Sequence, residues 1–150
     1  MRAVLQRVSE CILRIDGAMF SQIGRGLLVL VGITEGDTEE DIEWISKKVL
    51  NMRIFDDSDG IMNCSVLDMD YELLIVSQFT LLASTKKGNR PSYIKAAKGP
   101  ISKPIFEKLI DKLSDLAGMD IKTGQFGADM KIQLINDGPV TILLDSKNKE

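Results

Sequence analysis

Two short apolar runs limit the possible folds of this chain more than any other feature of its 150 residues. One run extends from Leu27 to Ile33, directly after Gly26, and the other from Leu73 to Val76. Each is long enough for a strand, and neither shows the strict alternation that is typical of a strand with one face in water. The sequence therefore predicts buried strands at the centre of the fold.

Turn signals place further strands on either side of the first run. Residues 2–8 alternate enough to form a strand, and Asp16-Gly17 is a strong hairpin signal between residues 12–15 and 20–23. The first third of the chain is therefore predicted to be a β-meander.

Two amphipathic helices are predicted outside the meander. Thr38 begins a segment with capping-box character, and that helix is expected to end near Asn51. The second is expected to open at Pro104 and to stop at Gly118. A polar connector is expected before the second helix, either without regular structure or with a short helix after Pro91.

Three strands are expected after the second helix, around residues 121–126, 129–136 and 139–145. This order of elements indicates the class α/β in its mixed α+β form. We expect a single domain over residues 1–150, with a β-rich core of meander and mixed sheets packed with two main helices. The tail, residues 146–150, is expected to be mobile.

Composition excludes several kinds of site. The chain has no histidine, so a Ser-His-Asp triad, a Cys-His pair and a His-ligated metal are all impossible. The two cysteines, Cys11 and Cys64, have no metal-binding spacing and indicate a reduced, cytoplasmic protein. No apolar run approaches the ~20 residues that cross a membrane. We expect no metal, no cofactor and no membrane contact.

Charge is distributed unevenly, although the net charge is only −3. No acidic residue lies between Glu72 and Glu107, and that stretch contains a series of cations. They form either a surface that binds phosphates or an ordinary solvated face. The residues proposed for the phosphate surface are Lys86, Lys87, Arg90, Lys95 and Lys98.

The segment Ser77-Gln78-Phe79-Thr80, at the end of the second apolar run, is the first candidate site. Its hydroxyls can simply satisfy a local turn. Alternatively, backbone amides near Phe79 and Thr80 stabilise an oxyanion while Gln78 orients a polar group. Thr80 would need an activating base to act as a nucleophile, and no histidine can supply one.

Asn136-Asp137-Gly138-Pro139-Val140-Thr141, between two apolar runs, is the second candidate. A trans proline that begins a strand is the commoner arrangement. The functional alternative needs the carbonyls of Gly138 and Pro139 to point side by side into a cavity. Phe126 can stack on a base or pack in the core, and Met130 is more often a core residue.

Taken together, the two candidate segments resemble the paired signature of the D-aminoacyl-tRNA deacylases of the bacterial and eukaryotic type. Further stretches fit the same family, from Met1 to about Asp145: Gln6-Arg7-Val8, Arg53-Ile54-Phe55, Gly88-Asn89-Arg90-Pro91-Ser92 and Gly127-Ala128-Asp129-Met130.

The resemblance implies hydrolysis of the ester that joins a D-amino acid to the 3′ end of tRNA, as proofreading in translation. It implies a homodimer in which a cis Gly138-Pro139 step enters the partner's pocket, where its carbonyls exclude L-residues. Glycyl-tRNA would not be excluded in this way. Catalytic residues would be Ser77, Gln78, Phe79 and Thr80. Substrate-binding and chiral-selection residues would be Gly138, Pro139, Arg7, Asn136, Phe126 and Met130.

Two other classes of function remain open from the residues alone. One is a binding module that holds tRNA ends without chemistry, and the other is a dimeric scaffold protein that does not bind RNA. Deacylation of charged tRNA separates the first alternative from an enzyme, and salt-sensitive tRNA affinity separates the second.

Overall fold

The two longest strands come from opposite ends of the chain. In the computed structural model, which describes residues 1–149, β1 (Arg2–Ile15) pairs antiparallel with β8 (Met130–Asp145) along nearly its whole length. The other edge of β1 is shared, because β3 (Gly26–Gly32) pairs with its first half and β2 (Ala18–Ile23) with its second half. The predicted strands and the hairpin at Asp16-Gly17 are confirmed, but the meander order is wrong. Residues 2–8 and 12–15 form one strand, and β3 pairs with β1 instead of β2.

The sheet continues from β3 to β6 (Glu72–Ser77) and then to β7 (Lys122–Thr123), all parallel. β3 and β6 are buried on both faces, since their residues alternate between two apolar clusters. Leu27 and Leu73 belong to the cluster under the helices, and Leu28 and Leu74 belong to the cluster on the opposite face. The prediction of buried strands from the two apolar runs is confirmed.

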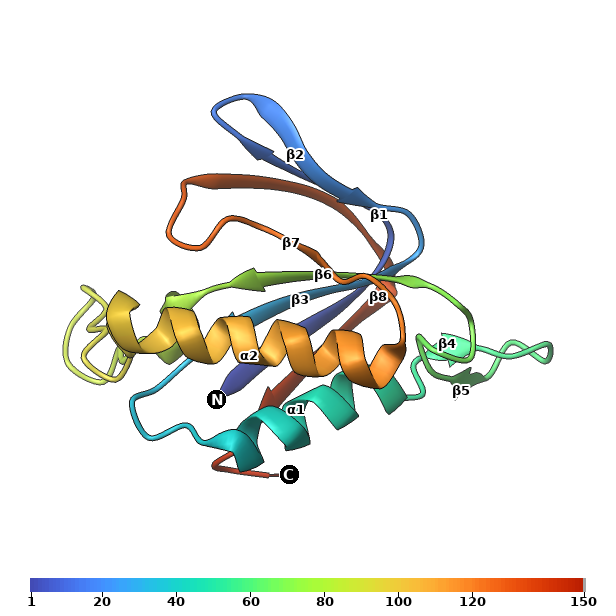
Figure 1. Ribbon diagram of the computed structural model, residues 1–150. Coiled ribbons are helices and arrows are strands. Elements are labelled where there is room, and N and C mark those ends of the chain that lie inside the picture. The colour runs from blue at the N-terminus through green and yellow to red at the C-terminus, as the bar shows by residue number, and fades with distance from the viewer. Residues whose placement is uncertain (150) are drawn as a thin grey trace.

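Helices α1 (Glu39–Asn51) and α2 (Gly99–Ala117) lie side by side on one face of the sheet (Figure 1). Ile45 of α1 and Leu109 of α2 are fully buried in the cluster between helices and sheet. The capping box at Thr38 is present, because the Thr38 N–H donates to the Asp41 carboxylate at 2.7 Å. The bounds predicted for α1 are therefore confirmed.

The predicted start of α2 is wrong. The helix begins at Gly99 and contains Pro104, which was expected to open it. Pro100 lies in the first turn, where the missing N–H costs nothing, so Pro104 removes only one internal hydrogen bond, the one to the Pro100 carbonyl. Gly118 ends the helix in the left-handed conformation, as predicted.

The optional helix after Pro91 does not form in residues 83–98, all of which the structure describes. Ser84 and Ser92 instead form an isolated antiparallel bridge. The small sheet of β4 (Phe55–Asp56) and β5 (Met62–Cys64) lies beside α1, and the 3₁₀ turn η1 (Phe79–Leu82) follows β6.

The three strands predicted after α2 are two in the structure. β7 is only Lys122–Thr123, and β8 is continuous through Gly138-Pro139. β8 stays paired with β1 on both sides of this step. The step interrupts the pairing register, which shifts between Gln6 and Val8 and again between Val8 and Glu10.

The C-terminal residues expected to be mobile make contacts as far as Lys149, whose ammonium lies 5.3 Å from the centre of the Trp44 ring. The Ser146 hydroxyl donates to the Asp41 carboxylate at 2.6 Å, and the Lys147 ammonium donates to the other oxygen of Asp41 at 2.6 Å. Glu150 lies outside the described residues. The mixed α+β class with two main helices is confirmed. Within residues 1–149, no helix is both long and apolar enough to cross a membrane.

Candidate active site

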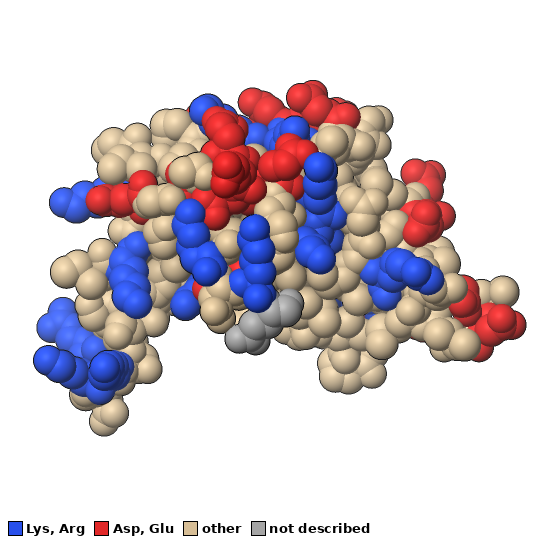
Figure 2. Space-filling model, turned by 90° about the horizontal axis from the view of Figure 1, so that it is seen from below, with Lys and Arg blue, Asp and Glu red and all other residues tan. Residues whose placement is uncertain are grey.

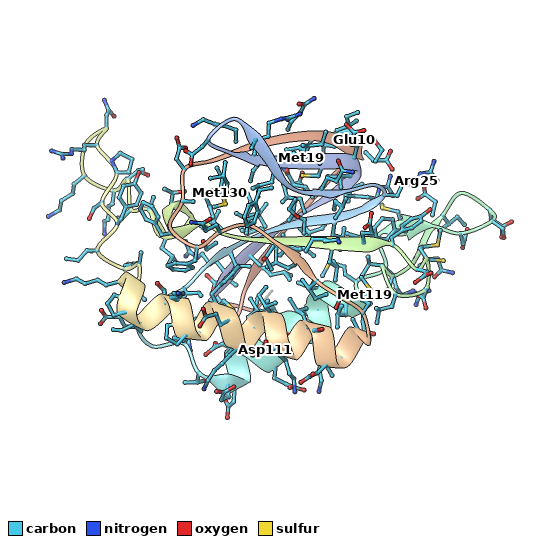
Figure 3. The ribbon with its side chains drawn as sticks, turned by 45° about the horizontal axis from the view of Figure 1, so that its top comes forward. Glu10, Met19, Arg25, Asp111, Met119 and Met130 are labelled. Carbon is cyan, nitrogen blue, oxygen red and sulfur yellow. The ribbon has the colours of Figure 1, made fainter. Side chains whose placement is uncertain are left out.

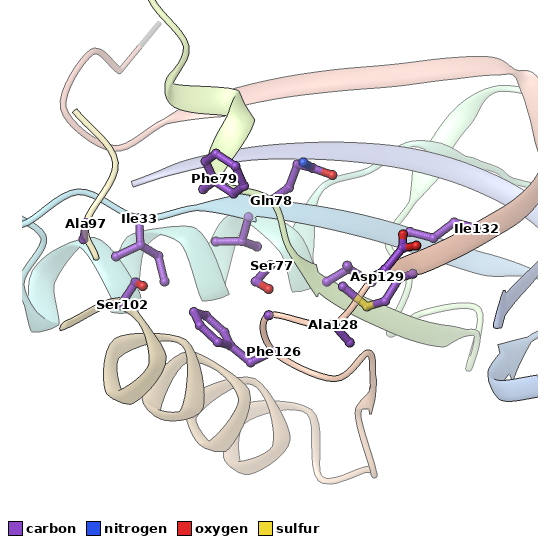
Figure 4. A pocket seen from close by; sticks show the side chains of 14 residues that line it. Ile33, Ser77, Gln78, Phe79, Ala97, Ser102, Phe126, Ala128, Asp129 and Ile132 are labelled. Atoms are coloured by element: carbon purple, nitrogen blue, oxygen red, sulfur yellow. The ribbon is translucent and has the colours of Figure 1, made fainter. Parts of the chain in front are cut away.

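A cavity of about 320 Å³ opens at the carboxyl end of β6 (Figure 4). Ser77 ends β6 and Gln78 and Phe79 follow it, so this strand end forms one wall. Phe126 and Met130, on the segment that leads into β8, form the opposite wall. Five of the residues predicted from the sequence therefore line one cavity.

Backbone hydrogen bonds fix the shape of the strand end. The Gln78 N–H donates to the Val31 carbonyl at 2.7 Å, which extends the β3–β6 pairing by one residue before the chain turns into η1. The Gln78 side-chain amide then donates to the Thr80 hydroxyl at 2.6 Å. N–H groups at the start of a 3₁₀ turn have no acceptor inside the turn, so those of Phe79 and Thr80 are not used within η1, although Thr80 itself does not line the cavity.

The remaining wall of the cavity is mostly apolar. Ile33, Ala97 and Ile132 contribute to it, together with the hydroxyl-bearing residue Ser102. Asp129 is the one titratable side chain among the described lining residues, and both of its oxygens accept hydrogen bonds from Lys131, at 2.7 and 3.0 Å. The cavity therefore offers mainly apolar contact, and its one side-chain carboxylate among the described residues is paired with Lys131.

Sequence reasoning missed Ile33, Ala97, Ser102 and Asp129 as lining residues. Ala97 comes from the connector that was predicted to be polar, and Ser102 from a turn of α2 that was predicted to lie outside the helix. The Ala97 N–H donates to the Ile33 carbonyl at 2.8 Å, which brings the connector onto the end of β3. No local pattern signals this contact, because it joins distant parts of the chain.

Arg7 lies at a second place, where it supports the Gly138-Pro139 step. Its side chain is 8% exposed, and the guanidinium donates through Nε to the Asp137 carbonyl at 3.1 Å and through Nη1 to the Ile54 carbonyl at 2.8 Å. The Gly138-Pro139 peptide bond is cis, and Gly138 has a φ of +122°, which favours glycine.

Asn136 fixes the Gly138-Pro139 step from the other side. Its side-chain oxygen accepts the Val140 N–H at 2.9 Å, and its amide donates to the Thr141 hydroxyl at 3.0 Å. Arg7 and Asn136 therefore hold the two ends of the Gly138-Pro139 step in one conformation.

The two groups of predicted site residues lie apart in a single chain. Gly138 and Pro139 are exposed, and neither lines the cavity at Ser77. Figure 3 shows the separation, with Met130 of the first cavity near one end of the sheet and Arg25, which shares a small second cavity with Arg7 and Asp137, near the other. If both groups act on one substrate, they must come from two copies.

The five cations predicted to contact phosphate are all exposed on residues 83–98, the connector between η1 and α2. Figure 2 shows a group of Lys and Arg side chains at the end of the molecule where this connector projects in Figure 1. The connector leads to Ala97, which lines the cavity, so Lys95 and Lys98 flank a lining residue in the chain.

Neither cysteine is placed to act as a nucleophile. Both are free thiols, and neither lines the cavity at Ser77. Burial raises the pKa of the Cys11 thiol to about 11, which keeps it protonated at neutral pH.

Comparison with known proteins agrees with the motifs. The sequence pattern of the family described as D-Tyr-tRNA(Tyr) deacylase matches residues 4–145. A protein of Bacteroides thetaiotaomicron named D-aminoacyl-tRNA deacylase is 59% identical over the full length of both chains, and one of Flavobacterium johnsoniae with the same name is 55% identical, also over both full lengths.

Two solved structures share the fold. One, titled c-Myc DNA Unwinding Element Binding Protein, is 40% identical with a TM-score of 0.91 and covers 97% of this chain and 98% of its own. The other, from the structural analysis of a probable eukaryotic D-amino acid tRNA deacylase, has a TM-score of 0.84 at 16% identity over 95% of this chain and 97% of its own, and so shows the fold alone. With a family pattern that spans the chain and relatives of nearly 60% identity, this chain belongs to the D-Tyr-tRNA(Tyr) deacylase family.

Proposed function

We propose that this protein hydrolyses the ester bond of D-aminoacyl-tRNA and releases the free D-amino acid and the tRNA. The observation that carries the proposal is the full-length identity of 59% to a protein named for this activity. The cavity at the end of β6 supports it, because it has a mostly apolar wall and lies at the start of η1, where N–H groups have no acceptor inside the turn.

The terminal nucleoside of the tRNA is proposed to lie against Phe126 and Met130. Its ester would then reach Ser77, Gln78 and Phe79 on the facing wall of the cavity. The N–H groups of Phe79 and Thr80 would stabilise the oxyanion that forms when water attacks the carbonyl. An aminoacyl ester is already reactive, so positioning and charge stabilisation can supply most of the catalysis.

Thr80 is not proposed as a nucleophile. Its hydroxyl accepts a hydrogen bond from Gln78, and no carboxylate or lysine among the described residues is hydrogen-bonded to it. We favour assistance by the 2′-hydroxyl of the terminal ribose. Thr80→Ala should then retain most of the activity, measured as kcat on D-aminoacyl-tRNA, whereas a Thr80 nucleophile predicts that kcat disappears in a folded variant.

Selection against L-residues is proposed to come from a second copy of the chain. The exposed Gly138 and Pro139 would enter the partner's cavity, where their carbonyls hold the amino group and leave no space for an L side chain. Two large apolar side chains on the same strand, Ile135 and Leu143, are 58% and 68% exposed, as expected of a surface that a partner covers. Arg7 and Asn136 would fix the direction of the carbonyls.

This form of selection needs no pocket for the side chain. Many D-amino acids should therefore be accepted, and glycine should not be excluded, because it has no side chain to meet the carbonyls. We propose that the protein removes such mischarged residues in the cytoplasm, as proofreading in translation, without a metal or cofactor. The cations from Lys86 to Lys98 are proposed to contact the tRNA backbone.

A matched pair of charged tRNAs tests the proposal. D-tyrosyl-tRNA and L-tyrosyl-tRNA are incubated with the protein, and release of tyrosine is followed against the uncatalysed rate. The proposal expects fast release from the D form only. Equal rates on both forms would contradict the proposed chiral selection. No release from either form would contradict the proposed enzymatic activity.

One feature of the cavity is also consistent with a second function. The absence of a free side-chain base among its described residues also suits a module that binds tRNA ends without chemistry. Such a module would bind both charged tRNAs in the assay above and leave both esters intact.

A further inference from the structure

An aromatic pair stands at the rim of the cavity. Phe79 lines the cavity and is 56% exposed, and Tyr93 lies outside it and is 39% exposed. Their ring centroids are 5.1 Å apart, with the planes at 77°, so one ring meets the face of the other by its edge. The two rings therefore present aromatic surface to solvent at the edge of the cavity.

The position of Tyr93 is fixed by the connector that carries it. Ser84 and Ser92 exchange two backbone hydrogen bonds, at 2.8 and 2.9 Å, directly before Tyr93. The Tyr93 carbonyl then accepts the Ala96 N–H at 2.9 Å, and Ala97 bonds to Ile33 at the cavity wall. Tyr93 is therefore held beside the cavity by bonds on both sides of it, without lining it.

The charges around Tyr93 indicate what could lie on it. Lys86, Lys87 and Arg90 precede it and Lys95 and Lys98 follow it, all of them exposed, with no acidic residue between Glu72 and Glu107. Proteins that bind single-stranded nucleic acid combine such cations with aromatic side chains on which successive bases stack. A cavity for one nucleoside that is followed by an exposed aromatic ring has the same arrangement.

We propose that the Phe79–Tyr93 pair is a nucleobase-stacking site for the nucleotide that precedes the terminal adenosine of the tRNA. This inference rests on the proposed function, since it places the terminal nucleoside in the cavity. The penultimate base lies on Tyr93, and its phosphate faces the cations of residues 86–98. Because every base has a π-face, the site reads the presence of a base more than its identity.

The test compares two substrates that differ by one nucleotide. The first is a D-amino acid esterified to adenosine, and the second is the same ester on the dinucleotide cytidylyl-adenosine. The wild-type protein is expected to hydrolyse the dinucleotide ester with a kcat/KM about tenfold higher, the size of one base–aromatic stack. Tyr93→Ala is expected to abolish this gain and to leave the adenosine ester unaffected.

Three further variants separate stacking from packing. Tyr93→Phe keeps the ring and should keep the higher kcat/KM on the dinucleotide ester. Tyr93→Leu keeps apolar contact with Phe79 but has no ring, so it should lose that gain. Tyr93→Leu also provides the test if Tyr93→Ala fails to fold. Ile94→Ala is the matched control, because Ile94 is 88% exposed on the same connector. It should change neither rate.

Salt dependence distinguishes the ring from the charges. Tyr93→Ala should leave the slope of affinity against salt for intact tRNA unchanged, whereas Lys95→Gln should reduce it. The inference is overturned if Tyr93→Leu retains the gain, if Tyr93→Ala slows both esters by the same factor, or if it changes the size of the protein in solution. Hydrolysis of both esters by the wild type at one rate overturns the inference alone, and failure to release tyrosine from D-tyrosyl-tRNA overturns the proposed function with it.

Discussion

At position 138 the backbone itself requires glycine. The φ of +122° is unfavourable for any L side chain, and a Cβ would lie 2.8 Å from Val140 Cγ2 and 3.0 Å from Arg7 Nη2. Gly138→Ala should therefore shift the two carbonyls that are proposed to select the substrate. We expect kcat/KM on D-tyrosyl-tRNA to fall by about 100-fold or more, since displacements near 1 Å have such effects on positioning.

Gly60→Ala is the control for that variant. Gly60 also has a positive φ, +74°, but a Cβ there meets nothing within 4 Å, and the residue lies in the turn before β5. It should lose stability, by about 1 kcal/mol, without losing activity. If both variants lose activity equally, general destabilisation explains the effect and the carbonyls of Gly138-Pro139 have no special role.

Arg7 carries a prediction of its own. Its fork of donors bonds the Asp137 and Ile54 carbonyls at once, which a lysine ammonium on a flexible stem cannot reproduce. Arg7→Lys should lower the free energy of unfolding by about 1–2 kcal/mol in a denaturant titration, and should reduce the ratio of D to L hydrolysis. Asp56→Asn, which removes only a half-exposed partner of Arg7, should cost less than about 1 kcal/mol and preserve the ratio.

Among individual residues, the sequence was informative where a local rule applies. Ser77 to Phe79 were found because polar residues follow a buried strand, and Phe126 and Met130 lie opposite them in the structure. Ala97 and Ser102 could not be found in this way. They reach the cavity because a connector closes onto β3, and no residue in the connector signals that contact.

The N-terminus of α1 contains a carboxylate, Asp41, that makes the stability of the fold depend on pH. Burial alone would raise the pKa of the Asp41 carboxyl, but hydrogen bonds from Lys147, Ser146 and Thr38 outweigh burial and lower it. A depressed pKa in the folded protein means that the carboxylate stabilises the fold above the unfolded pKa of about 4, and that this stability is lost as the pH falls.

Asp41→Asn should therefore lower the free energy of unfolding at pH 7 by about 1–2 kcal/mol. The difference from the wild type should shrink as the pH falls below about 4, because the Asp41 carboxyl then takes up a proton in the unfolded chain while the folded protein still holds it ionised. Denaturant titrations at several pH values measure it. Glu40→Gln, a change in the exposed first turn of α1, should remain within about 0.5 kcal/mol, and a difference for Asp41→Asn that is constant with pH would contradict the assignment.

For elements, sequence predicted what local chemistry decides and failed where pairing or packing overrides it. The hairpin at Asp16-Gly17 and the bounds of α1 follow from turn and cap residues. β8 runs through Gly138-Pro139 because β1 supplies partners on both sides of the step. α2 extends to Gly99 because one missing hydrogen bond at Pro104 is a smaller cost than the packing that the longer helix gains.

At the scale of the whole molecule, the separation of the two site halves has a direct consequence. Each chain carries one cavity at Ser77 and one exposed Gly138-Pro139 step, and the step does not line its own cavity. In a twofold symmetric dimer, each complete site would combine the cavity of one protomer with the step of its partner. Two chains with different defects should then repair one another.

Gly138→Ala and the double variant Gln78→Ala/Phe79→Ala provide the two defects, one in the step and one in the cavity. Each homodimer should be inactive. Heterodimers purified through two different tags should recover about half of the wild-type kcat, because one of their two sites joins an intact cavity to an intact step. Dimers that carry Gly138→Ala on both tagged chains should recover nothing, since both steps are then defective. Recovery in that control, or none in the first pair, would mean that cavity and step do not act across the subunit boundary.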